Sequence, residues 1–439
     1  MVNSKDIVKR LKQAVYQGQI RIDIDAAQNP DLRRAIHIVE EFLKTSGRVC
    51  YGGQAINANL PKKDQFYNLE TSLPDYDFFS PDYRSDIREL VSNLKSAGFT
   101  EISERIGIHE GTTKIFVNYT AIADITQMDA EFYEQIHKRS VSIDGIHYAD
   151  PLFLKMLMYV ELSRPRGMLS RWDKVYERLS LLETAHPLKP CSNKNPRVLE
   201  NKAANQSRGA LLNFVLKNKR VFMGADIHPL YLSSGQGKTP KSRTQYILRG
   251  KSPMVFMSPD ADIDADYLGD ELRARKEQIL GFQGILPAMV ALYQGDMMIC
   301  LIVQEEACHS NITIELTKGR VLHLASLDTL LTFLIGLYYR DDHILMASDS
   351  LLCWLRHYTG LLAKYRAHPT KTVPSFPLEC SGYQTTFASL LRAKGARIEA
   401  ARQRIGSGAR RLGTFTAKKS NIVRRETLRG TRKRYLKYD

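Results

Sequence analysis

The sequence has few cysteines and no histidine pattern typical of metal sites. Its six cysteines are scattered over 439 residues without a Cys-x-x-Cys pair. This spacing predicts neither a zinc site nor a disulfide framework, and it favours a reducing compartment. The 11 histidines form no HxH or HExxH pattern, so the common zinc-hydrolase signatures are excluded.

Long hydrophobic runs are also absent. The N-terminal stretch "MVNSKDIVKRLKQ" lacks the apolar core of a signal peptide. The longest apolar run, near "LLTFLIGLYY", is too short to span a bilayer. We therefore expect a soluble, cytoplasmic protein without membrane contact.

The net charge of +16 is concentrated at the C-terminal end. From Leu391 to Asp439, 16 Lys and Arg residues accompany only three acidic residues, so this segment carries +13. The remainder holds 47 basic and 44 acidic residues. A basic segment on a nearly neutral body favours a polyanionic partner, and nucleic acid before membrane. The alternative is a solvated tail that only aids solubility.

The order of the expected elements predicts a mixed α/β domain in the first third of the chain. Apolar residues at helical spacing predict a helix over 31–46, and "GRVCYGG" reads as a short strand ending in two glycines. A helical start over 54–60, a strand over 75–80 and a helix over 86–98 follow. Two further strands are expected in "TKIFVNY" and "AIADITQM".

The rest of the chain predicts a helical segment, a second α/β unit and the basic end. The predicted domains are an N-terminal helical region, a catalytic domain, a helical segment that completes the cleft, a second α/β domain and a basic RNA-binding segment. Their expected ranges are 1–46, 47–148, 149–190, 191–366 and 367–439.

Two aspartates one residue apart, Asp75 and Asp77, are the strongest chemical feature. Side chains at i and i+2 of a strand point to the same face, and Tyr76 and Phe78 between and after them would face the core. Two carboxylates on one face can share hard divalent cations such as Mg²⁺ or Mn²⁺. Two such ions activate an attacking hydroxyl and stabilise a leaving pyrophosphate. By itself, an Asp-x-Asp pattern also occurs by chance on surface strands.

Gly52 and Gly53 precede these aspartates between a strand and a helix. A glycine pair there lets the backbone approach a phosphate closely, although an isolated pair is more often a structural turn. A third carboxylate would complete a two-metal site, and Asp124 is the candidate, because a charge between Ile122 and Ile125 on a strand costs energy unless it is paired or binds metal.

The order strand, Gly-Gly, helix, Asp-x-Asp and lone strand aspartate resembles the DNA-polymerase-beta-type nucleotidyltransferases. The longer sequence pattern "YGGQAIN…LP…DYDFFS…ADITQM" resembles that of the poly(A) polymerase catalytic subunits of large nucleocytoplasmic DNA viruses, the poxvirus, asfarvirus and giant-virus group. The resemblance implies that Asp75, Asp77 and Asp124 are metal ligands and that Gly52 and Gly53 face the triphosphate of ATP. It also implies that the second α/β domain is a nucleotidyltransferase-like domain without a metal site.

Two departures accompany this resemblance. The superfamily usually has serine after the first glycine, where this chain has Gly53 followed by Gln54. The segment between Gly53 and Asp75 is also longer than usual. Contacts to phosphate are therefore expected to come mainly from the backbone.

Some cation must offset the charge of a triphosphate. The candidates are Lys155, Arg171 and Lys174 in the helical stretch 150–182. The alternative for each is an ordinary basic helix face.

The sequence therefore predicts a template-independent polynucleotide adenylyltransferase that adds AMP from ATP to RNA 3′ ends with two Mg²⁺ or Mn²⁺ ions. The resemblance further implies a homodimer or a separate processivity subunit, and a place in the host cytoplasm, a viral factory or the virion. Two alternatives stay open: another RNA nucleotidyltransferase or oligoadenylate synthase, and an inactive RNA-binding scaffold of the same fold.

Overall fold

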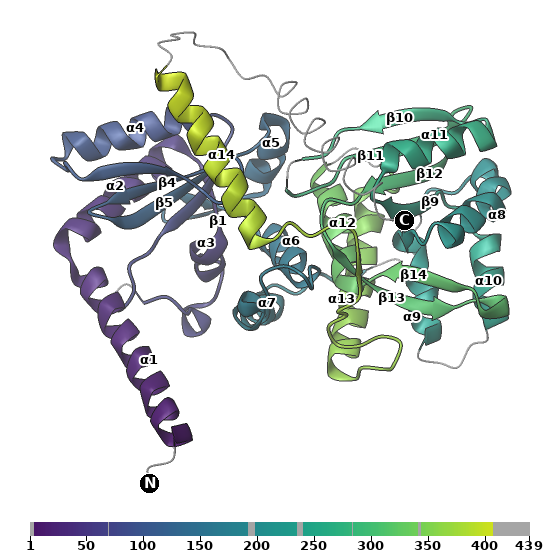
Figure 1. The fold of residues 1–439 in the computed structure, drawn as a ribbon, viewed down its shortest axis with the longest axis horizontal. Coiled ribbons are helices and arrows are strands. Elements are labelled where there is room, and N and C mark those ends of the chain that lie inside the picture. The colour runs from purple at the N-terminus through teal and green to yellow at the C-terminus, as the bar shows by residue number, and fades with distance from the viewer. Residues whose placement is uncertain are drawn as a thin grey trace. The chain divides into compact units, whose positions relative to one another are not determined.

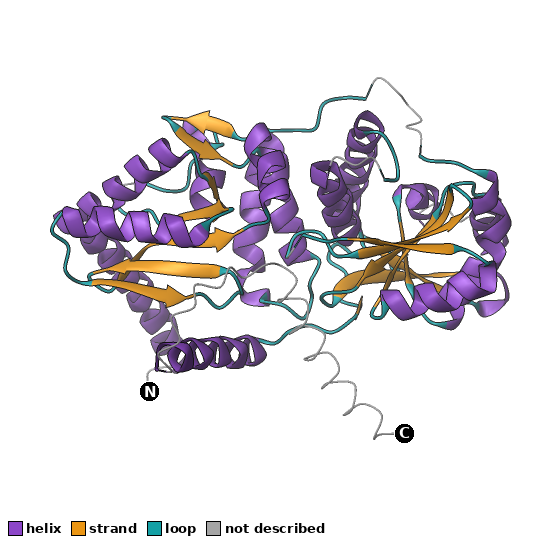
Figure 2. Ribbon diagram, turned by 90° about the horizontal axis from the view of Figure 1, so that it is seen from above, coloured by secondary structure: helices purple, strands orange, loops and turns teal. Residues whose placement is uncertain are grey.

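The computed structural model describes residues 4–68, 70–191, 198–234, 240–282, 284–340 and 344–406. The chain divides into two compact units, Met1–Leu390 and Leu391–Asp439. The first unit contains two β-sheets, and helices flank each of them (Figure 2). The boundary between units falls within α14 (Phe387–Gly406). The mixed α/β prediction is thus confirmed, whereas the predicted domain boundaries stay predictions.

The first sheet has seven strands in the order β3-β4-β5-β2-β1-β7-β6. Helices separate β1, β2 and β3 along the chain, whereas β3–β5 and β6–β7 are consecutive strands (Figure 1). The elements up to this sheet's last strand are α1 (Ser4–Gln28), α2 (Pro30–Ser46), β1 (Val49–Tyr51), α3 (Gly52–Ala58), β2 (Tyr76–Ser80), α4 (Tyr83–Ser96), β3 (Ile102–Ile106), β4 (Thr112–Val117), β5 (Thr120–Gln127), α5 (Ala130–Arg139), β6 (Val141–Ile143) and β7 (Ile146–Tyr148).

Helix α2 shows how local sequence sets these elements. The Asn29 side chain accepts hydrogen bonds from the backbone N–H groups of Asp31 and Leu32, which caps the helix start. Pro30 occupies the first turn, where its missing N–H costs nothing. The apolar stripe beginning at Leu32 is buried against the sheet. The helix predicted over 31–46 is therefore confirmed.

The second sheet has eight strands in the order β10-β11-β12-β9-β8-β14-β13-β15. Its elements are α8 (Lys202–Lys217), β8 (Val221–Met223), α9 (His228–Ser234), α10 (Pro240–Arg249), β9 (Met254–Ser258), α11 (Ala261–Leu272), β10 (Arg275–Ile279), β11 (Met289–Gln294), β12 (Met297–Gln304), β13 (His309–Glu315), β14 (Val321–Ala325), α12 (Leu327–Arg340), α13 (Ser348–Ala367) and β15 (Cys380–Ser381).

The two sheets repeat one pairing pattern. Strand β1 runs antiparallel to β2 and parallel to β7, while β2 runs parallel to β5. In the second sheet, β8 runs antiparallel to β9 and parallel to β14, while β9 runs parallel to β12. Only β15 has no counterpart in the first sheet. The second half thus has the strand order of the first, as the resemblance implies.

A buried ion pair recurs at the same place in both halves. Arg48 immediately precedes β1 and binds Asp86 of α4 through two hydrogen bonds of 2.7 and 3.0 Å. Arg220 immediately precedes β8 and binds Asp264 of α11 through two hydrogen bonds of 2.7 and 2.9 Å. Such bidentate pairs fix the orientation of the guanidinium and the carboxylate as well as their distance. One pair links β1 to α4, the helix that follows β2. The other links β8 to α11, the helix that follows β9.

Helices α6 (Pro151–Leu162) and α7 (Trp172–Ala185) follow the first sheet, and α6 packs on α12 of the second half. The Tyr339 hydroxyl of α12 donates a 2.5 Å hydrogen bond to Asp150, the residue that caps α6. Phe132 of α5 stacks on Phe282, with ring centroids 4.3 Å apart. These contacts join the two halves into one compact unit. Within the described ranges, no helix is long and apolar enough to cross a membrane.

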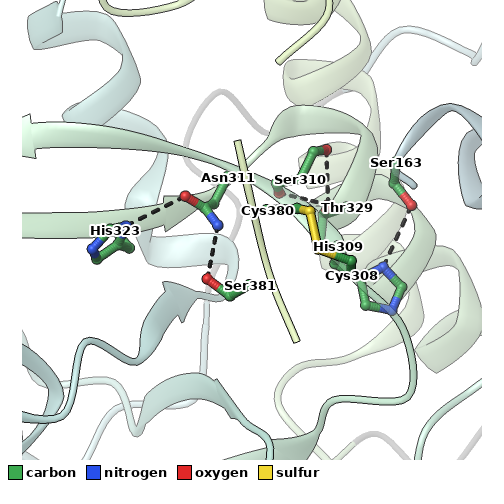
Figure 3. Close-up of a disulfide and its surroundings, with 9 residues drawn as sticks. All are labelled: Ser163, Cys308, His309, Ser310, Asn311, His323, Thr329, Cys380 and Ser381. Carbon is green, nitrogen blue, oxygen red and sulfur yellow. Dashed lines mark hydrogen bonds between the residues drawn. A yellow bond between two sulfur atoms is a disulfide. The ribbon is translucent and has the colours of Figure 1, made fainter. Parts of the chain in front are cut away.

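Four cysteines form two disulfides, Cys191–Cys353 and Cys308–Cys380. The prediction of no disulfide framework was wrong, because the partners are 162 and 72 residues apart and only the fold brings them together. Figure 3 shows the Cys308–Cys380 bond. It holds β15 on the edge of the second sheet, where Asn311 also donates a 3.0 Å hydrogen bond to Ser381.

A buried ion pair between α12 and α13 gives a prediction about stability. Arg366 donates a 2.6 Å hydrogen bond to Asp328, and the two side chains are 6% and 1% exposed. Asp328→Ala leaves the Arg366 charge buried without its partner. We expect the free energy of unfolding to fall by about 3–5 kcal/mol, measured by chemical denaturation. Asp349→Ala, at an exposed position in the first turn of α13, is the control. Equal denaturation midpoints for the two variants would contradict the prediction.

Candidate active site

Asp77 and Asp124 lie beside each other on neighbouring parallel strands. They are Cα partners in the pairing of β2 with β5, and Asp77 is also opposite Tyr51 at the end of β1. Tyr76 and Phe78 on the other face of β2 are 6% and 0% exposed, as the alternation predicts. Asp75 lies one residue before β2 begins and is exposed. The sequence predicts two carboxylates on one buried strand. Asp77 lies on that strand, whereas Asp75 lies just before it.

Two of the three carboxylates have raised pKa values. Burial, with the charges of Asp75 and Asp124, raises the pKa of Asp77 to about 7. Burial also raises the pKa of Asp124, against the opposing effect of Lys114 and with a further contribution from Asp75. The charges of Asp75 and Asp124 thus destabilise the ionised form of Asp77, and a bound cation would relieve this repulsion.

Gly52 faces Asp77 directly. Its φ of +73° lies in the left-handed region, and a Cβ at this position would overlap the Asp77 carboxylate. The residue is therefore glycine for two reasons, its backbone conformation and the carboxylate against it.

Gly53 faces a different group. A Cβ there would lie 2.5 Å from the Tyr67 hydroxyl and 3.2 Å from an Arg178 nitrogen. The two glycines thus separate the aspartates on one side from a tyrosine and an arginine on the other.

Three cations lie along α7: Arg171 at its N-cap, and Lys174 and Arg178 within the helix. Arg171 pairs with Glu161 at 3.1 Å, and its charge opposes the rise in the pKa of Asp77. The pKa of Lys174 is lowered by burial and by Arg178 and Arg171, whereas Asp75 opposes that shift. We call Arg171, Lys174 and Arg178 the α7 cations. Their placement opposite the carboxylates suits a ligand that carries several negative charges.

Lys155 lies elsewhere. Its side chain is 4% exposed and donates to the backbone oxygen of His186, just beyond α7. His186 in turn donates a 2.6 Å hydrogen bond to the backbone oxygen of Asn59. Burial lowers the pKa of Lys155, and the charges that oppose this shift are Glu183 and Asp150. The structure therefore does not bring Lys155 to the carboxylates, and its contacts are structural.

This difference gives a kinetic prediction. If ATP is the substrate, as the sequence predicts, Lys174→Met is expected to raise the KM for ATP about fivefold, since an exposed cation contributes up to about 1 kcal/mol to an ionic contact. Lys155→Met removes a lysine of the same helical region and should change that KM by less than about twofold. Steady-state kinetics with varied ATP distinguish the two. A larger effect from Lys155→Met would contradict this placement.

Sequence reasoning missed three residues of this site. Lys114 of β4 is the Cα partner of Asp124 and forms an ion pair with it. Tyr67 lies in the long segment between the glycines and the aspartates, and Arg178 lies one turn after Lys174. The four-residue spacing from Lys174 to Arg178 was a signal that could have found the latter.

The donor chemistry fits divalent ions, because carboxylate oxygens are the ligands that Mg²⁺ and Mn²⁺ prefer. In the described part of the chain, however, no three His, Cys, Asp or Glu side chains are already grouped at metal-binding distances. Asp124 is paired with Lys114 instead. The fit therefore rests on the register of Asp77 with Asp124, on Asp75 one residue before the same strand, and on the raised pKa of Asp77.

The second sheet lacks this constellation. By the shared pairing pattern, Val255 and Leu301 take the positions of Asp77 and Asp124. Gly224 follows β8 as Gly52 follows β1. The glycine turn is thus repeated, whereas the acidic pair occurs in the first sheet and has apolar residues as its counterparts in the second.

The N-terminal third of the chain is similar to known proteins. Residues 37–168 match the family model described as "Poly(A) polymerase catalytic subunit". A putative poly(A) polymerase catalytic subunit of Acanthamoeba polyphaga mimivirus is 30% identical over 192 residues, which are 42% of this chain and 32% of the relative. A protein of the same description from African swine fever virus is 24% identical over 168 residues, 37% of this chain and 35% of the relative.

The chain therefore spans about a third of the length of these curated relatives. The crystal structure of the Megavirus polyadenylate synthase superposes with a TM-score of 0.74 at 19% identity, covering 91% of this chain and 83% of that one. At this identity the likeness shows the fold. The resemblance described from the sequence is thus confirmed for the segment that carries the carboxylates and the glycine turn.

Proposed function

We propose that the protein is a template-independent polynucleotide adenylyltransferase, which adds AMP from ATP to the 3′ end of RNA. The observation that carries this proposal is the register of Asp77 with Asp124 beside Gly52, with Asp75 one residue before the same strand. The family match over residues 37–168 supports the same activity. ATP is then the substrate, and the basic segment from Leu391 would bind the RNA.

The carboxylates would hold two Mg²⁺ or Mn²⁺ ions. When bound, such ions supply Lewis-acid stabilisation of the attacking and leaving oxygens. Asp75 and Asp77 would ligate both ions and Asp124 the one nearer the attacking hydroxyl, and Lys114 would give up its ion pair with Asp124 on loading. Asp77 is held in place by the buried residues on either side of it, which keeps the site preorganised.

The reaction needs no covalent intermediate with the protein. The RNA 3′-oxygen attacks the α-phosphorus, its proton passes to solvent or a carboxylate, and the bond from the α-phosphorus to the bridging oxygen breaks. Pyrophosphate leaves with the electron pair of that bond. The α7 cations Arg171, Lys174 and Arg178 would bind the β- and γ-phosphates, as cations do in other phosphoryl transfers.

Incubation of the chain with an RNA primer, Mg²⁺ or Mn²⁺ and each single nucleotide tests this proposal. We expect a homopolymer from ATP and little product from CTP, GTP or UTP. Similar products from all four nucleotides would instead indicate another RNA nucleotidyltransferase. RNA binding without any incorporation would indicate a scaffold of this fold.

Assembly and location are part of the same proposal. Processive extension would come from a homodimer or from a separate subunit, and sedimentation of the chain with and without RNA tests the former. The place of action would be the host cytoplasm, a viral factory or the virion.

A further inference from the structure

The segment between the glycines and the aspartates is attached to the helix that follows the glycines. The side-chain oxygen of Asn57 in α3 accepts hydrogen bonds from the backbone N–H groups of Phe66 and Tyr67, at 2.8 and 3.0 Å. The ring of Phe66 lies at 65° to that of Tyr67, with centroids 4.7 Å apart. These contacts fix where the Tyr67 side chain can point.

Arg178 holds the other end of this side chain. Its Nη2 donates a 2.9 Å hydrogen bond to the Tyr67 hydroxyl. Its guanidinium also lies 4.4 Å from the centroid of the Phe66 ring and 5.4 Å from that of Tyr67, within the range of cation–π attraction. Tyr67 and Phe66 are both half-buried, as is Arg178.

The Tyr67 hydroxyl therefore occupies the space that a side chain at Gly53 would need. It accepts a hydrogen bond from Arg178, and within the described ranges its own proton has no acceptor. A phenolic hydroxyl can donate one hydrogen bond while it accepts another. An oxygen bound to a guanidinium also becomes a stronger donor, because the cation withdraws electron density.

The surrounding charges indicate what the acceptor is. Arg178 raises the positive potential at Lys174, whose pKa it lowers after the effect of burial. On the other side, Gly52 separates the hydroxyl from Asp77. The Tyr67 hydroxyl lies between Gly53 and Arg178, and a chain of phosphates is a ligand whose charge suits the positive charges of Arg178 and Lys174.

We propose that Tyr67 is a triphosphate-binding residue of this site, donating its hydroxyl proton to a phosphate oxygen while Arg178 holds it in place. This inference rests on the proposed function. It assigns a role to a residue that belongs to neither the Gly-Gly pair nor the Asp-x-Asp pattern. The long segment between Gly53 and Asp75 thereby contributes to the phosphate side of the site. Tyr67 also explains why position 53 has no side chain, since its hydroxyl fills that space.

Tyr67→Phe is the direct test, because phenylalanine retains the ring and its contacts with Phe66 and Arg178. Titration of the full chain with a non-hydrolysable ATP analogue and, separately, with AMP gives the two affinities by calorimetry. We expect the affinity for the ATP analogue to fall about tenfold or more, as for loss of a hydrogen bond to a charged group. The affinity for AMP and the thermal unfolding midpoint should stay unchanged.

Tyr119→Phe is the matched control, because Tyr119 is exposed in the β4–β5 hairpin. Three outcomes would overturn the proposal. One is unchanged affinity for the ATP analogue in Tyr67→Phe. Another is an equal loss for AMP with a lower unfolding midpoint, which would indicate a packing role. Absence of ATP binding by the wild-type chain would overturn both this proposal and the proposed function, whereas unchanged Tyr67→Phe affinity with normal wild-type binding would overturn this proposal alone.

A second pair of variants tests whether a hydroxyl at position 53 can replace the Tyr67 hydroxyl. Gly53→Ser should weaken binding of the ATP analogue, because the added Cβ would lie 2.5 Å from the Tyr67 hydroxyl. In a Tyr67→Ala background the same substitution loses its tightest contacts and meets only the end of the Arg178 side chain, at 3.2 Å, and its hydroxyl would face the same phosphate. We therefore expect Gly53→Ser to strengthen binding in that background. Weaker binding in both backgrounds would contradict the proposal that the serine hydroxyl introduced by Gly53→Ser can replace the Tyr67 hydroxyl.

Discussion

Replacing Asp77 with asparagine is expected to reduce AMP incorporation into an RNA primer by at least about a thousandfold, since a metal ligand provides several kcal/mol of transition-state stabilisation. Asparagine has the shape of aspartate, but its neutral amide neither attracts divalent cations strongly nor contributes charge. Because Asp77 is the residue that pairs with Asp124 and contacts Gly52, its loss affects the whole carboxylate group. Primer extension with ATP at saturating Mg²⁺ measures the effect.

Folding controls make this result interpretable. Asp77→Asn removes a buried carboxylate whose charge is destabilised by burial, Asp75 and Asp124, so the unfolding midpoint without divalent ions should be equal to that of the wild type or higher. Asp296→Asn, at an exposed turn between β11 and β12, is the matched control and should retain full activity. Incorporation by Asp77→Asn at the wild-type rate would refute the assignment of Asp77 as a metal ligand.

Removal of residues 407–439 is expected to weaken binding of single-stranded RNA at least about a hundredfold at low salt, because each phosphate contact releases a counterion. This segment carries 11 Lys and Arg residues and two acidic ones. If roughly six of its cations contact phosphate, the slope of log K against log salt should fall by about 4. Fluorescence anisotropy of a labelled oligo(A) over a salt series measures both quantities.

The truncation has its own control. A full-length variant with glutamine at the 11 basic positions keeps the length of the segment and removes only its charge. It should behave like the truncated chain, and in both proteins the rate at saturating primer should stay close to that of the wild type. An unchanged salt slope in either protein would show that the RNA is bound elsewhere.

The sequence was most informative where the pattern that predicts a strand also places a carboxylate on it. The alternation of Asp77 with buried Tyr76 and Phe78 predicts a strand that presents a carboxylate. The predicted strand of Asp124 is present as β5, and its pairing with β2 puts the two carboxylates in register. Their function as ligands is still a proposal, whereas their proximity follows from the fold.

Residues whose contacts depend on register or on a loop were not predictable in this way. The hairpin of β4 and β5 has Val117 opposite Thr120 next to its turn, and an irregularity between Ile115 and Phe116 shifts the pairing by one residue. That shift brings Lys114 opposite Asp124, so a regular hairpin would have placed them out of register. The position of Tyr67 likewise depends on side-chain contacts with Asn57 and Arg178 rather than on a repeating pattern.

One missed element did have a sequence signal. The strands β6 and β7 form a hairpin whose turn is Asp144-Gly145, a dipeptide typical of tight turns. Strand β7 then pairs with β1 and makes it an interior strand of the sheet. The glycine turn after β1 therefore projects from the middle of the sheet, where it can contact Asp77.

The glycine after β1 and the glycine after β8 are under different structural constraints. Gly224 has φ 114° and ψ 165°, a backbone region that is nearly restricted to glycine. The turn after β8 therefore requires glycine even though Val255 and Leu301 take the positions of the acidic pair. Gly52 is constrained twice, by its own backbone and by the Asp77 carboxylate, which a Cβ there would overlap. A glycine turn in this fold therefore indicates the backbone geometry of the strand end, and only the carboxylate against it indicates chemistry.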